Sequence, residues 1–399
     1  MNFTTAEKIF SQTGNGRNGL PAWTFNNEEL NQLEIERIFL RNWFWVGHVS
    51  DIPNPGDYKC QDLANERAVV IKGEDGEVRA FHNLCRHRGS RVVGEETGNC
   101  KKAIVCPFHG WSYHLDGGLR SIPHAKTFPD IDKSQYGLKP VDCEVWHGLI
   151  FIRFQGDGAS VAETFAEAEE EISLYNLADM KPYDEPWHYD FDLDWKAVLD
   201  IDNEGYHVPI GHPGLFDLFG SSYQDQVLES GIKRSHGYLK DYPCKTPLVQ
   251  NYIDTLPAQS YLPESHQRIW IYWSAFPGFV ITLMPDMIEV YQTYSLGYQK
   301  SIMAGACYAL ADDRVAMQKT REFNREINQV VGDEDIKLVK WSDQGMRSSV
   351  YESALLSDLE LGIAAFQNQL RRVLPVVTLA QPPEAGKLAS KNTELESTL

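Results

Sequence analysis

The apolar positions of residues 25–43 recur at the spacing of one helix face. They are Leu30, Leu33, Ile35, Ile38 and Phe39. Asn27 stands just before them, and asparagine is a preferred residue for capping the first turn of a helix. The pattern therefore predicts that residues 25–43 are mostly helical, and an N-terminal helical segment is expected over residues 1–40.

The pattern changes after Trp45 to short apolar or alternating runs, which glycine, proline and aspartate separate as far as Phe154. Residues 67–83 read as two strands joined at Asp75-Gly76, a dipeptide that is typical of hairpin turns. Residues 147–154 read as another strand. These runs predict a β-rich domain over residues 41–155.

A glycine-rich joint at residues 155–160 opens a second domain, predicted over residues 156–380. Its first segment, residues 162–177, reads as an acidic helix whose charges form a solvated face. Further strands are predicted within residues 186–195, 268–276, 278–285, 287–297 and 301–310, and helices within 312–345 and 357–374. Residues 381–399 lack periodicity and are expected to form a flexible tail. The whole indicates an α+β protein.

Composition narrows the class of protein. Of the 399 residues, 42% are hydrophobic and 23% charged, as in ordinary globular proteins of two domains. No apolar run is long enough to span a bilayer, and the N-terminus lacks the basic and apolar regions of a secretory signal. We therefore expect no membrane partner and a cytoplasmic location.

Charge and cysteine content argue against two further classes, nucleic-acid-binding proteins and disulfide-stapled proteins. The net charge is −19, from 37 basic and 56 acidic residues, which argues against nucleic acid as a partner. The 7 cysteines show no disulfide framework, and free thiols suit a reducing compartment.

Two short motifs in the β-rich domain each combine one cysteine with one histidine. They are Cys85-Arg86-His87 and Cys106-Pro107-Phe108-His109. Such spacing suits two facing loop tips, each of which offers one thiolate and one imidazole. A binuclear centre can then take both cysteines on one iron and both histidines on the other, which is the ligand set of a Rieske [2Fe–2S] cluster.

Structural zinc is the alternative for these four residues. Zinc also binds two cysteines with two histidines, but zinc fingers usually present the cysteines as one pair and the histidines as the next. The mixed order of this chain favours the cluster.

A second pair of histidines, His207 and His212, lies in the larger domain. Five positions separate them, which on an ideal helix turns the two side chains apart by about 140°. Pro209 and Gly211 break helices, so we expect a helix to end between the histidines and to let them converge. With one carboxylate they would form the facial triad that binds non-haem Fe(II) and leaves positions open for O2. Taken alone, this histidine spacing is also common among surface and core residues.

Taken in series, the motifs resemble those of the α subunits of Rieske non-haem iron oxygenases, the ring-hydroxylating oxygenase family. The resemblance covers nearly the whole chain, and its most specific stretches are CRH with CPFHGWSY, and EGYHVPIGHP. It implies a Rieske domain over residues 41–155 and a catalytic domain of helix-grip type over residues 156–380, with residues 1–40 packed on the catalytic domain.

The resemblance also implies the ligands of the second metal. His207 and His212 would bind Fe(II), and the third ligand would be an acidic residue late in the chain. Asp335 is the chosen position, and Asp333, Glu334 and Asp343 remain alternatives.

Glu204 matches the family's acidic residue three positions before the first iron histidine. By the resemblance, it hydrogen-bonds His207 and reaches a cluster histidine, His109, of a neighbouring subunit in a head-to-tail homotrimer. Many members have asparagine shortly before this acid, whereas this chain has Asp200 and Ile201. In having glutamate at position 204, the chain resembles the branch of the family that acts on carnitine, betaine and stachydrine.

The function that the resemblance implies is that of an oxygenase component, and the presence of a small β subunit is left open. Electrons would come from NAD(P)H through a flavin- or ferredoxin-type reductase, and O2 would oxygenate a small organic substrate. The hypothesis is hydroxylation with N-dealkylation of a quaternary ammonium compound; aromatic ring hydroxylation is the alternative. A Rieske electron carrier without oxygenase activity needs only the first motif and is the second alternative.

A quaternary ammonium substrate needs aromatic ring faces around its cation. The candidate pocket residues are Tyr206, Trp270, Trp273 and Tyr291, with Tyr272 and Tyr294 as further aromatic positions. Aromatic residues are also what any half-buried sheet prefers, so core packing is the competing explanation for most of them.

Overall fold

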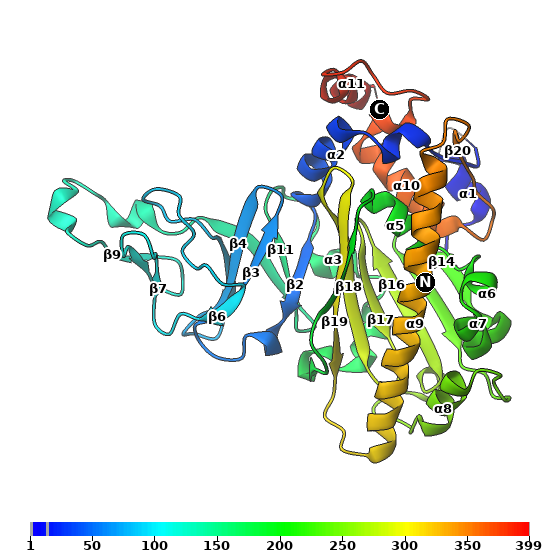
Figure 1. Ribbon diagram of the computed structural model, residues 1–399. Helices are drawn as coiled ribbons and strands as arrows, with labels where there is room; N and C mark the ends of the chain where they lie inside the picture. The colour runs from blue at the N-terminus through cyan, green and yellow to red at the C-terminus, as the bar shows by residue number, and fades with distance from the viewer. Residues whose placement is uncertain (1–2, 13–15, 399) are drawn as a thin grey trace. The chain divides into compact units, whose positions relative to one another are not determined.

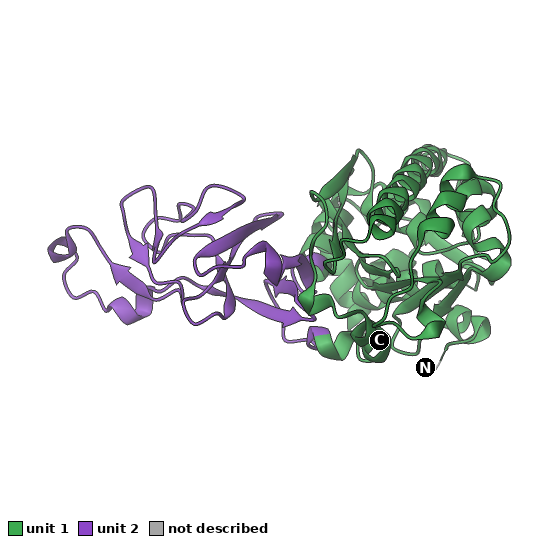
Figure 2. Ribbon diagram, turned by 90° about the horizontal axis from the view of Figure 1, so that it is seen from below, with its two compact units in different colours: residues 1–38, 162–399 green, residues 39–161 purple. Residues whose placement is uncertain are grey.

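The computed structural model describes residues 3–12 and 16–398. The chain divides into two compact units, residues 39–161 and residues 1–38 with 162–399 (Figure 2). The boundaries expected from the sequence, after residues 40 and 155, lie near these limits. Residues 1–38 thus belong to the unit that contains the second pair of histidines.

The smaller unit is built from two antiparallel sheets. A seven-stranded sheet has the order β2-β11-β10-β5-β4-β3-β6, and a three-stranded sheet the order β7-β8-β9. Their strands are β2 (Phe44–His48), β3 (Asp57–Leu63), β4 (Glu66–Lys72), β5 (Val78–His82), β6 (Thr97–Asn99), β7 (Ile104–Val105), β8 (Ser112–Tyr113), β9 (Leu119–Ser121), β10 (Pro140–Trp146) and β11 (Leu149–Arg153). The predicted hairpin at Asp75-Gly76 is confirmed, because Lys72 pairs with Val78 across it.

The larger unit has an eight-stranded antiparallel sheet of order β12-β19-β18-β17-β16-β15-β14, with β13 also paired to β19. Its strands are β12 (Lys181–Pro182), β13 (Trp187–Phe191), β14 (Gln224–Val227), β15 (Lys233–Tyr238), β16 (Ile269–Ala275), β17 (Phe279–Leu283), β18 (Ile288–Gly297) and β19 (Lys300–Ala309). A separate pair joins β1 (Asn18–Pro21) to β20 (Ser353–Leu355). The strands that alternation predicts within residues 186–310 are all present.

Helices pack around this sheet (Figure 1). They are α1 (Ala6–Ser11), α2 (Glu28–Glu34), α3 (Val161–Thr164), α4 (Glu169–Ile172), α5 (Trp195–Asp202), α6 (Val208–Gly211), α7 (Pro213–Phe219), α8 (Pro247–Thr255), α9 (Val315–Met346), α10 (Leu361–Val373) and α11 (Leu388–Glu396). The long helix predicted within residues 312–345 is α9, which lies beside α5, α6, α7 and α8. None of the described helices combines the length and the apolar character needed to cross a bilayer.

The predicted N-terminal helix is present as α2, followed by a π-helical turn over Ile35–Phe39. Asn27 caps it as expected, since its side chain accepts a hydrogen bond of 2.8 Å from the Leu30 amide.

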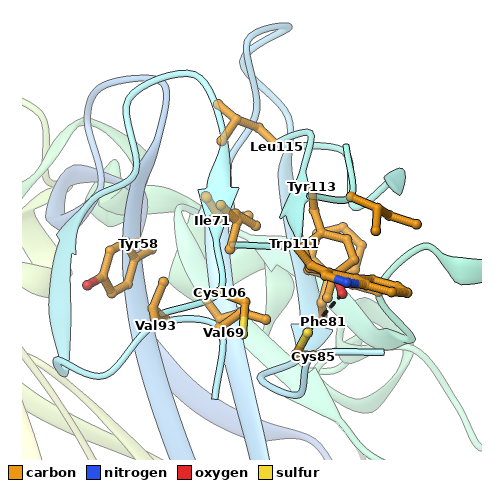
Figure 3. Packing of buried hydrophobic residues seen from close by; sticks show 14 residues of the cluster. Tyr58, Val69, Ile71, Phe81, Cys85, Val93, Cys106, Trp111, Tyr113 and Leu115 are labelled. Carbon is orange, nitrogen blue, oxygen red and sulfur yellow. Dashed lines mark hydrogen bonds between the residues drawn. The ribbon is translucent and has the colours of Figure 1, made fainter. Parts of the chain in front are cut away.

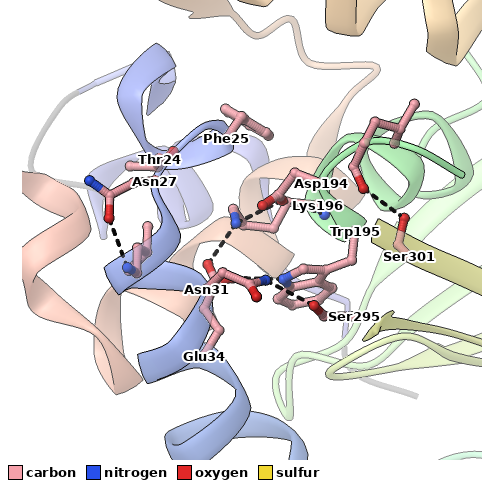
Figure 4. Close-up of polar contacts among 12 residues, drawn as sticks. Thr24, Phe25, Asn27, Asn31, Glu34, Asp194, Trp195, Lys196, Ser295 and Ser301 are labelled. Atoms are coloured by element: carbon pink, nitrogen blue, oxygen red, sulfur yellow. Dashed lines mark hydrogen bonds and ion pairs between the residues drawn. The ribbon is translucent and has the colours of Figure 1, made fainter. Parts of the chain in front are cut away.

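A buried charge cluster fixes α2 to α5 (Figure 4). The Lys196 ammonium lies 2.6 Å from Glu34 Oε1 and 2.7 Å from Asp194 Oδ1, and all three side chains are almost wholly buried. The Trp195 indole donates a hydrogen bond of 2.8 Å to the other oxygen of Glu34. Burial raises the pKa of Glu34 to about 7, even though Lys196 acts to lower it. Among the described residues, Lys196 is therefore the cation that pairs with both of these buried carboxylates.

Replacing Lys196 with methionine should lower the free energy of unfolding by about 3–5 kcal/mol, because it strands two buried acids. Chemical denaturation followed by tryptophan fluorescence measures the change. Lys8→Met is the matched control: its pair with Glu229 is about half exposed, so the loss should stay below about 1 kcal/mol. Equal effects of the two substitutions would refute the assigned role of the buried cluster.

The acidic helix predicted over residues 162–177 is wrong in two respects. The segment forms two short helices, α3 and α4, followed by a 3-10 turn over Ser173–Tyr175. Glu171 is also buried rather than solvated, because Arg234 donates two hydrogen bonds to it and the Trp273 indole donates a third. Burial opposes ionisation of Glu171, but these hydrogen bonds prevail and lower its pKa to about 2.

The expectation of a flexible tail over residues 381–399 is also wrong. Residues 388–396 form α11, in which Leu388 and Asn392 are buried. The Asn392 side chain accepts a hydrogen bond from the Val376 amide, and Glu29 accepts one from Gly386. Two buried side chains are enough to hold this helix against the rest of the unit. They are too few to give the sequence a helical repeat of apolar residues by which the helix could be predicted.

Candidate metal centres

Two loops of the smaller unit repeat one backbone conformation. The Cys85 amide donates to the Ser90 carbonyl, and the Gly89 amide donates to the Cys85 carbonyl. In the second loop, Cys106 and Trp111 are joined in the same way, as are Gly110 and Cys106. Gly89 and Gly110 have φ of +73° and +72°, a left-handed conformation that glycine adopts without strain. The two loops therefore present their side chains as a matched pair.

The four predicted cluster ligands converge at these loops. Cys85 and Cys106 are buried in the core of the unit, beside Trp111 and Tyr113 (Figure 3). The rings of His87 and His109 lie edge to face, with centroids 4.7 Å apart. The thiols thus lie inside and the imidazoles outside, and the His109 ring is exposed.

The polar contacts of the two loops also suit the binding of an iron–sulfur cluster. His87 Nδ1 is buried and has no hydrogen-bond partner among the described residues. Burial, together with His109 and Arg88, lowers the pKa of His87 and so favours the neutral imidazole that a metal binds. The Tyr113 hydroxyl lies 3.3 Å from Cys85 Sγ, as a hydrogen-bond partner of a ligand sulfur would.

The second pair of histidines flanks a single helical turn in the larger unit. His207 is the N-cap of α6 and His212 its C-cap, so this helix ends between the histidines as expected. It also begins after His207, because α5 has already ended at Asp202. Gly211 leaves the space that the His207 ring needs, since a Cβ at position 211 would lie 3.1 Å from that ring.

Three side chains meet at one point beside this turn. His207 Nε2 and His212 Nε2 are 3.0 Å apart, and Asp335 Oδ1 on α9 lies 3.7 Å and 2.9 Å from them. These are the three residues whose ligand atoms, in the described part of the chain, all lie within 4.8 Å of one another. Apart from the two imidazoles, the buried Asp335 Oδ1 has no hydrogen-bond partner among the described residues. The donor set of two imidazoles and one carboxylate suits Fe(II).

Each histidine of this trio is held from behind by a carboxylate. Glu204 Oε1 lies 2.5 Å from His207 Nδ1, and Glu334 Oε2 lies 2.8 Å from His212 Nδ1. A carboxylate that accepts the Nδ1 proton fixes the tautomer and leaves the Nε2 lone pair for a metal. Burial opposes a charge on His212, but Asp335 and Glu334 prevail and raise its pKa, so the site favours a positive charge.

The alternative third ligands lie elsewhere. Glu334 contacts the outer nitrogen of His212, not the shared point. Asp333 is exposed and accepts a hydrogen bond from Gln329, and Asp343 pairs with Arg347. Of the acids weighed from the sequence, the structure brings only Asp335 to the two histidines.

Family comparisons agree with this architecture. The Rieske [2Fe-2S] domain matches residues 42–136, and the catalytic domain of the ring hydroxylating alpha subunit matches residues 178–375. The chain belongs to the α subunits of the Rieske non-haem iron oxygenases. The predicted family and fold class are confirmed, and a [2Fe–2S] cluster and a mononuclear iron are its cofactors.

Two relatives align with most of the chain. The glycine betaine monooxygenase oxygenase subunit of Chromohalobacter salexigens is 25% identical, over 88% of this chain and 84% of that one. The carnitine monooxygenase oxygenase subunit of Escherichia coli K12 is 25% identical, over 89% and 93%. As a Rieske oxygenase, this chain is an oxidoreductase that uses O2, and the zinc-protein and electron-carrier alternatives fall away.

Solved structures share the fold. A quaternary ammonium Rieske monooxygenase has a TM-score of 0.77 at 21% identity, covering 93% of this chain and 99% of that one. Naphthalene 1,2-dioxygenase with indole bound has a TM-score of 0.70 at 20% identity, covering 100% of both chains.

The oxygenase has a cavity of about 560 Å³ beside its iron-binding residues. His207, His212 and Asp335 line it together with residues of the sheet and of α9. Tyr291 and Tyr272 also line this cavity. Trp187 reaches it because Gly305, its cross-strand neighbour, has no side chain: a Cβ there would lie 2.6 Å from the indole.

Three of the predicted pocket residues are placed elsewhere. Tyr206 is 57% exposed. Trp270 packs in the core with its indole bonded to the Tyr252 hydroxyl, and Trp273 bonds Glu171. Both tryptophans are wholly buried and neither lines the cavity: Trp270 belongs to an apolar cluster, and Trp273, on the opposite face of β16, lies beside the Glu171–Arg234 pair.

The sequence analysis missed two functional roles. Glu334 was weighed there as an iron ligand and not as the hydrogen-bond partner of His212, because no spacing rule separates it from its neighbour Asp335. Glu289 lines the cavity two residues before Tyr291 on β18. Alternation along the strand places positions 289 and 291 on one face, so the prediction of Tyr291 as a pocket residue could have indicated Glu289 as another.

Proposed function

We propose that this Rieske oxygenase acts on a small ammonium compound and removes an N-substituent by hydroxylating the carbon attached to nitrogen. The observation that carries the proposal is the lining of the cavity onto which His207, His212 and Asp335 open. It combines the aromatic residues Trp187 and Tyr291 with buried carboxylates, a setting that attracts an organic cation. Both long-aligned relatives are named for ammonium substrates, glycine betaine and carnitine.

Cys85, His87, Cys106 and His109 would hold the cluster, and His207, His212 and Asp335 the mononuclear iron. When bound, the two centres supply electrons and activate O2. One oxygen atom enters a C–H bond next to nitrogen, and the other leaves as water with a pair of electrons and a pair of protons. The resulting carbinolamine breaks into an amine and an aldehyde.

The residues of the chain do the positioning. Glu204 and Glu334 hold the Nδ1 protons of the two histidines, so that both Nε2 atoms point to one place. Asp335 comes from a separate element, the long helix α9. The cavity walls bring the substrate next to these residues and limit the access of water.

We also propose that three copies of the chain form a head-to-tail ring and that a reductase supplies the electrons from NAD(P)H. In such a ring, Glu204 links His207 to His109 of the partner subunit. Exposed apolar side chains support an interface at both places: Phe108, beside His109, is 54% exposed, and Ile210, within α6, is 88% exposed. The solved quaternary ammonium Rieske monooxygenase is described as transferring electrons between subunits.

The substrate class is tested by O2 uptake of the reconstituted enzyme with a reductase. Betaines and methylated amines should stimulate uptake and release an aldehyde. Neutral aromatic compounds and aromatic acids should not, because the carboxylates of the cavity attract cations, give a neutral ring no charge to pair with, and repel anions. Stimulation by aromatic compounds alone, with a hydroxylated ring as product, would overturn the ammonium proposal in favour of ring hydroxylation.

A further inference from the structure

A row of polar side chains crosses the sheet floor of the cavity. Tyr272 on β16 pairs with Thr282 on β17, Thr282 with Glu289 on β18, and Glu289 with Cys307 on β19. Cross-strand partners project on the same side of a sheet, and all four residues line the cavity. Alternation and register thus place one carboxylate at the centre of this polar row.

The carboxylate of Glu289 lacks a balancing cation. Its neutral neighbours are the Trp187 indole and Cys307 Sγ, which lies 3.8 Å from Oε1, and no lysine or arginine pairs with it in the described part of the chain. Burial raises its pKa to about 7. Removing a carboxylate from water without a counter-ion costs free energy. A carboxylate of this kind in the wall of a ligand cavity therefore points to a ligand that supplies the missing positive charge.

The cations of the cavity lining are occupied elsewhere. Lys233 donates a hydrogen bond of 2.9 Å to the carbonyl oxygen of Asp202. Arg325 pairs with Asp184. The two imidazoles of His207 and His212 face each other and their own carboxylates.

A second carboxylate faces the same space. Asp202 Oδ1 accepts a hydrogen bond of 2.8 Å from the Tyr291 hydroxyl, but Oδ2 is buried and has no partner among the described residues. Asp202 interacts electrostatically with Glu289, and also with Asp335 and His207. It therefore lies between the end of the cavity that holds Glu289 and the end that holds the iron ligands.

An independent polar atom in the row also lacks a partner. Thr282 is 1% exposed, and its Oγ1 has no hydrogen-bond partner among the described residues. The methyl groups next to an ammonium nitrogen carry part of its positive charge and make C–H···O contacts with such oxygens. The row therefore offers a cation both a carboxylate without a counter-ion and an unused oxygen.

We propose that Glu289 is the binding residue that selects the ammonium group of the substrate, with Thr282 and Asp202 beside it. This inference rests on the proposed function and assigns its charge recognition to one side chain. Glu289 is not part of the iron site, so its replacement changes substrate binding and leaves both metal centres in place.

Calorimetric titration of the intact enzyme tests the assignment with two probes of equal shape. Choline carries the ammonium charge, and 3,3-dimethylbutan-1-ol is its neutral carbon isostere. The wild-type enzyme should bind choline at least about 10-fold more tightly than the isostere, as expected for a buried carboxylate that pairs with a cation. In Glu289→Gln this preference should fall to nearly 1-fold, with the affinity for the isostere unchanged.

Two further variants sharpen the comparison. Glu289→Asp keeps the charge and should keep most of the preference, which a purely structural role of the side chain would not predict. Glu185→Gln removes a charge from an exposed residue of the same lining, where water screens it, and should change the preference less than about 2-fold.

A Glu289→Gln enzyme that still prefers choline overturns the inference, even if ammonium compounds stimulate O2 uptake. Loss of the preference supports the inference on binding. If ammonium compounds then fail to stimulate O2 uptake, the proposed function fails on its own.

Discussion

Replacing Glu204 with alanine should leave both metal centres filled and lower substrate-coupled turnover by at least about 100-fold. Both oxygens of Glu204 are engaged with His207, one at Nδ1 and the other at the backbone amide, 3.1 Å away. Removing a carboxylate that orients a ligand typically costs 10–100-fold in activity or metal affinity, and this carboxylate is also the proposed link to His109 of the partner subunit. In a single turnover, the reduced cluster should remain reduced after substrate and O2 are added.

The matched control is Glu334→Ala. Glu334 holds His212 as Glu204 holds His207, but the proposed link to the partner subunit does not include it. We expect this variant to bind iron more weakly and still to oxidise its cluster in a single turnover once iron is restored. A Glu204→Ala enzyme that oxidises its cluster at the wild-type rate would contradict the linking role.

The second large effect is expected at the third iron ligand. Asp335→Ala should lose the mononuclear iron and all detectable oxygenation, and keep the cluster with its visible spectrum, because the two sites lie in separate units. A facial triad reduced to two imidazoles holds Fe(II) far more weakly. Metal analysis after gel filtration, together with the visible spectrum, measures both centres in one sample.

Asp333→Ala is the control for this substitution, since Asp333 lies two residues earlier on α9 and is exposed. It should retain the mononuclear iron. If Asp333→Ala lost the iron and Asp335→Ala retained it, the assignment of the third ligand would be wrong.

The strands and the long helix could be predicted from the sequence because each follows one regular period. The strands within residues 268–310 alternate or run apolar, and α9 and α10 carry continuous helical patterns. The Cys-His motifs also indicated the cluster, since their chemistry lies within a few residues of each loop. Local information was sufficient in these cases.

What the sequence could not supply depends on distant partners. Glu171 looks like part of a solvated acidic run until Arg234, 63 residues later, folds against it. The choice among adjacent acids at positions 333–335 needs the rotation of α9 relative to His212, which lies 122 residues before Glu334. Alternation along β16 turns Trp273 to the face opposite Tyr272. Trp270 shares the face of Tyr272, so only its packing, with its indole bonded to the Tyr252 hydroxyl of α8, keeps it out of the cavity.

The most direct test of the account is the iron and sulfide content of the purified chain, read together with its visible spectrum. The account predicts about three irons and two sulfides per chain, with the red-brown colour of a Rieske cluster. Two irons with no third, even after Fe(II) is added back, would contradict the mononuclear site at His207, His212 and Asp335. Zinc in a colourless protein would contradict both centres.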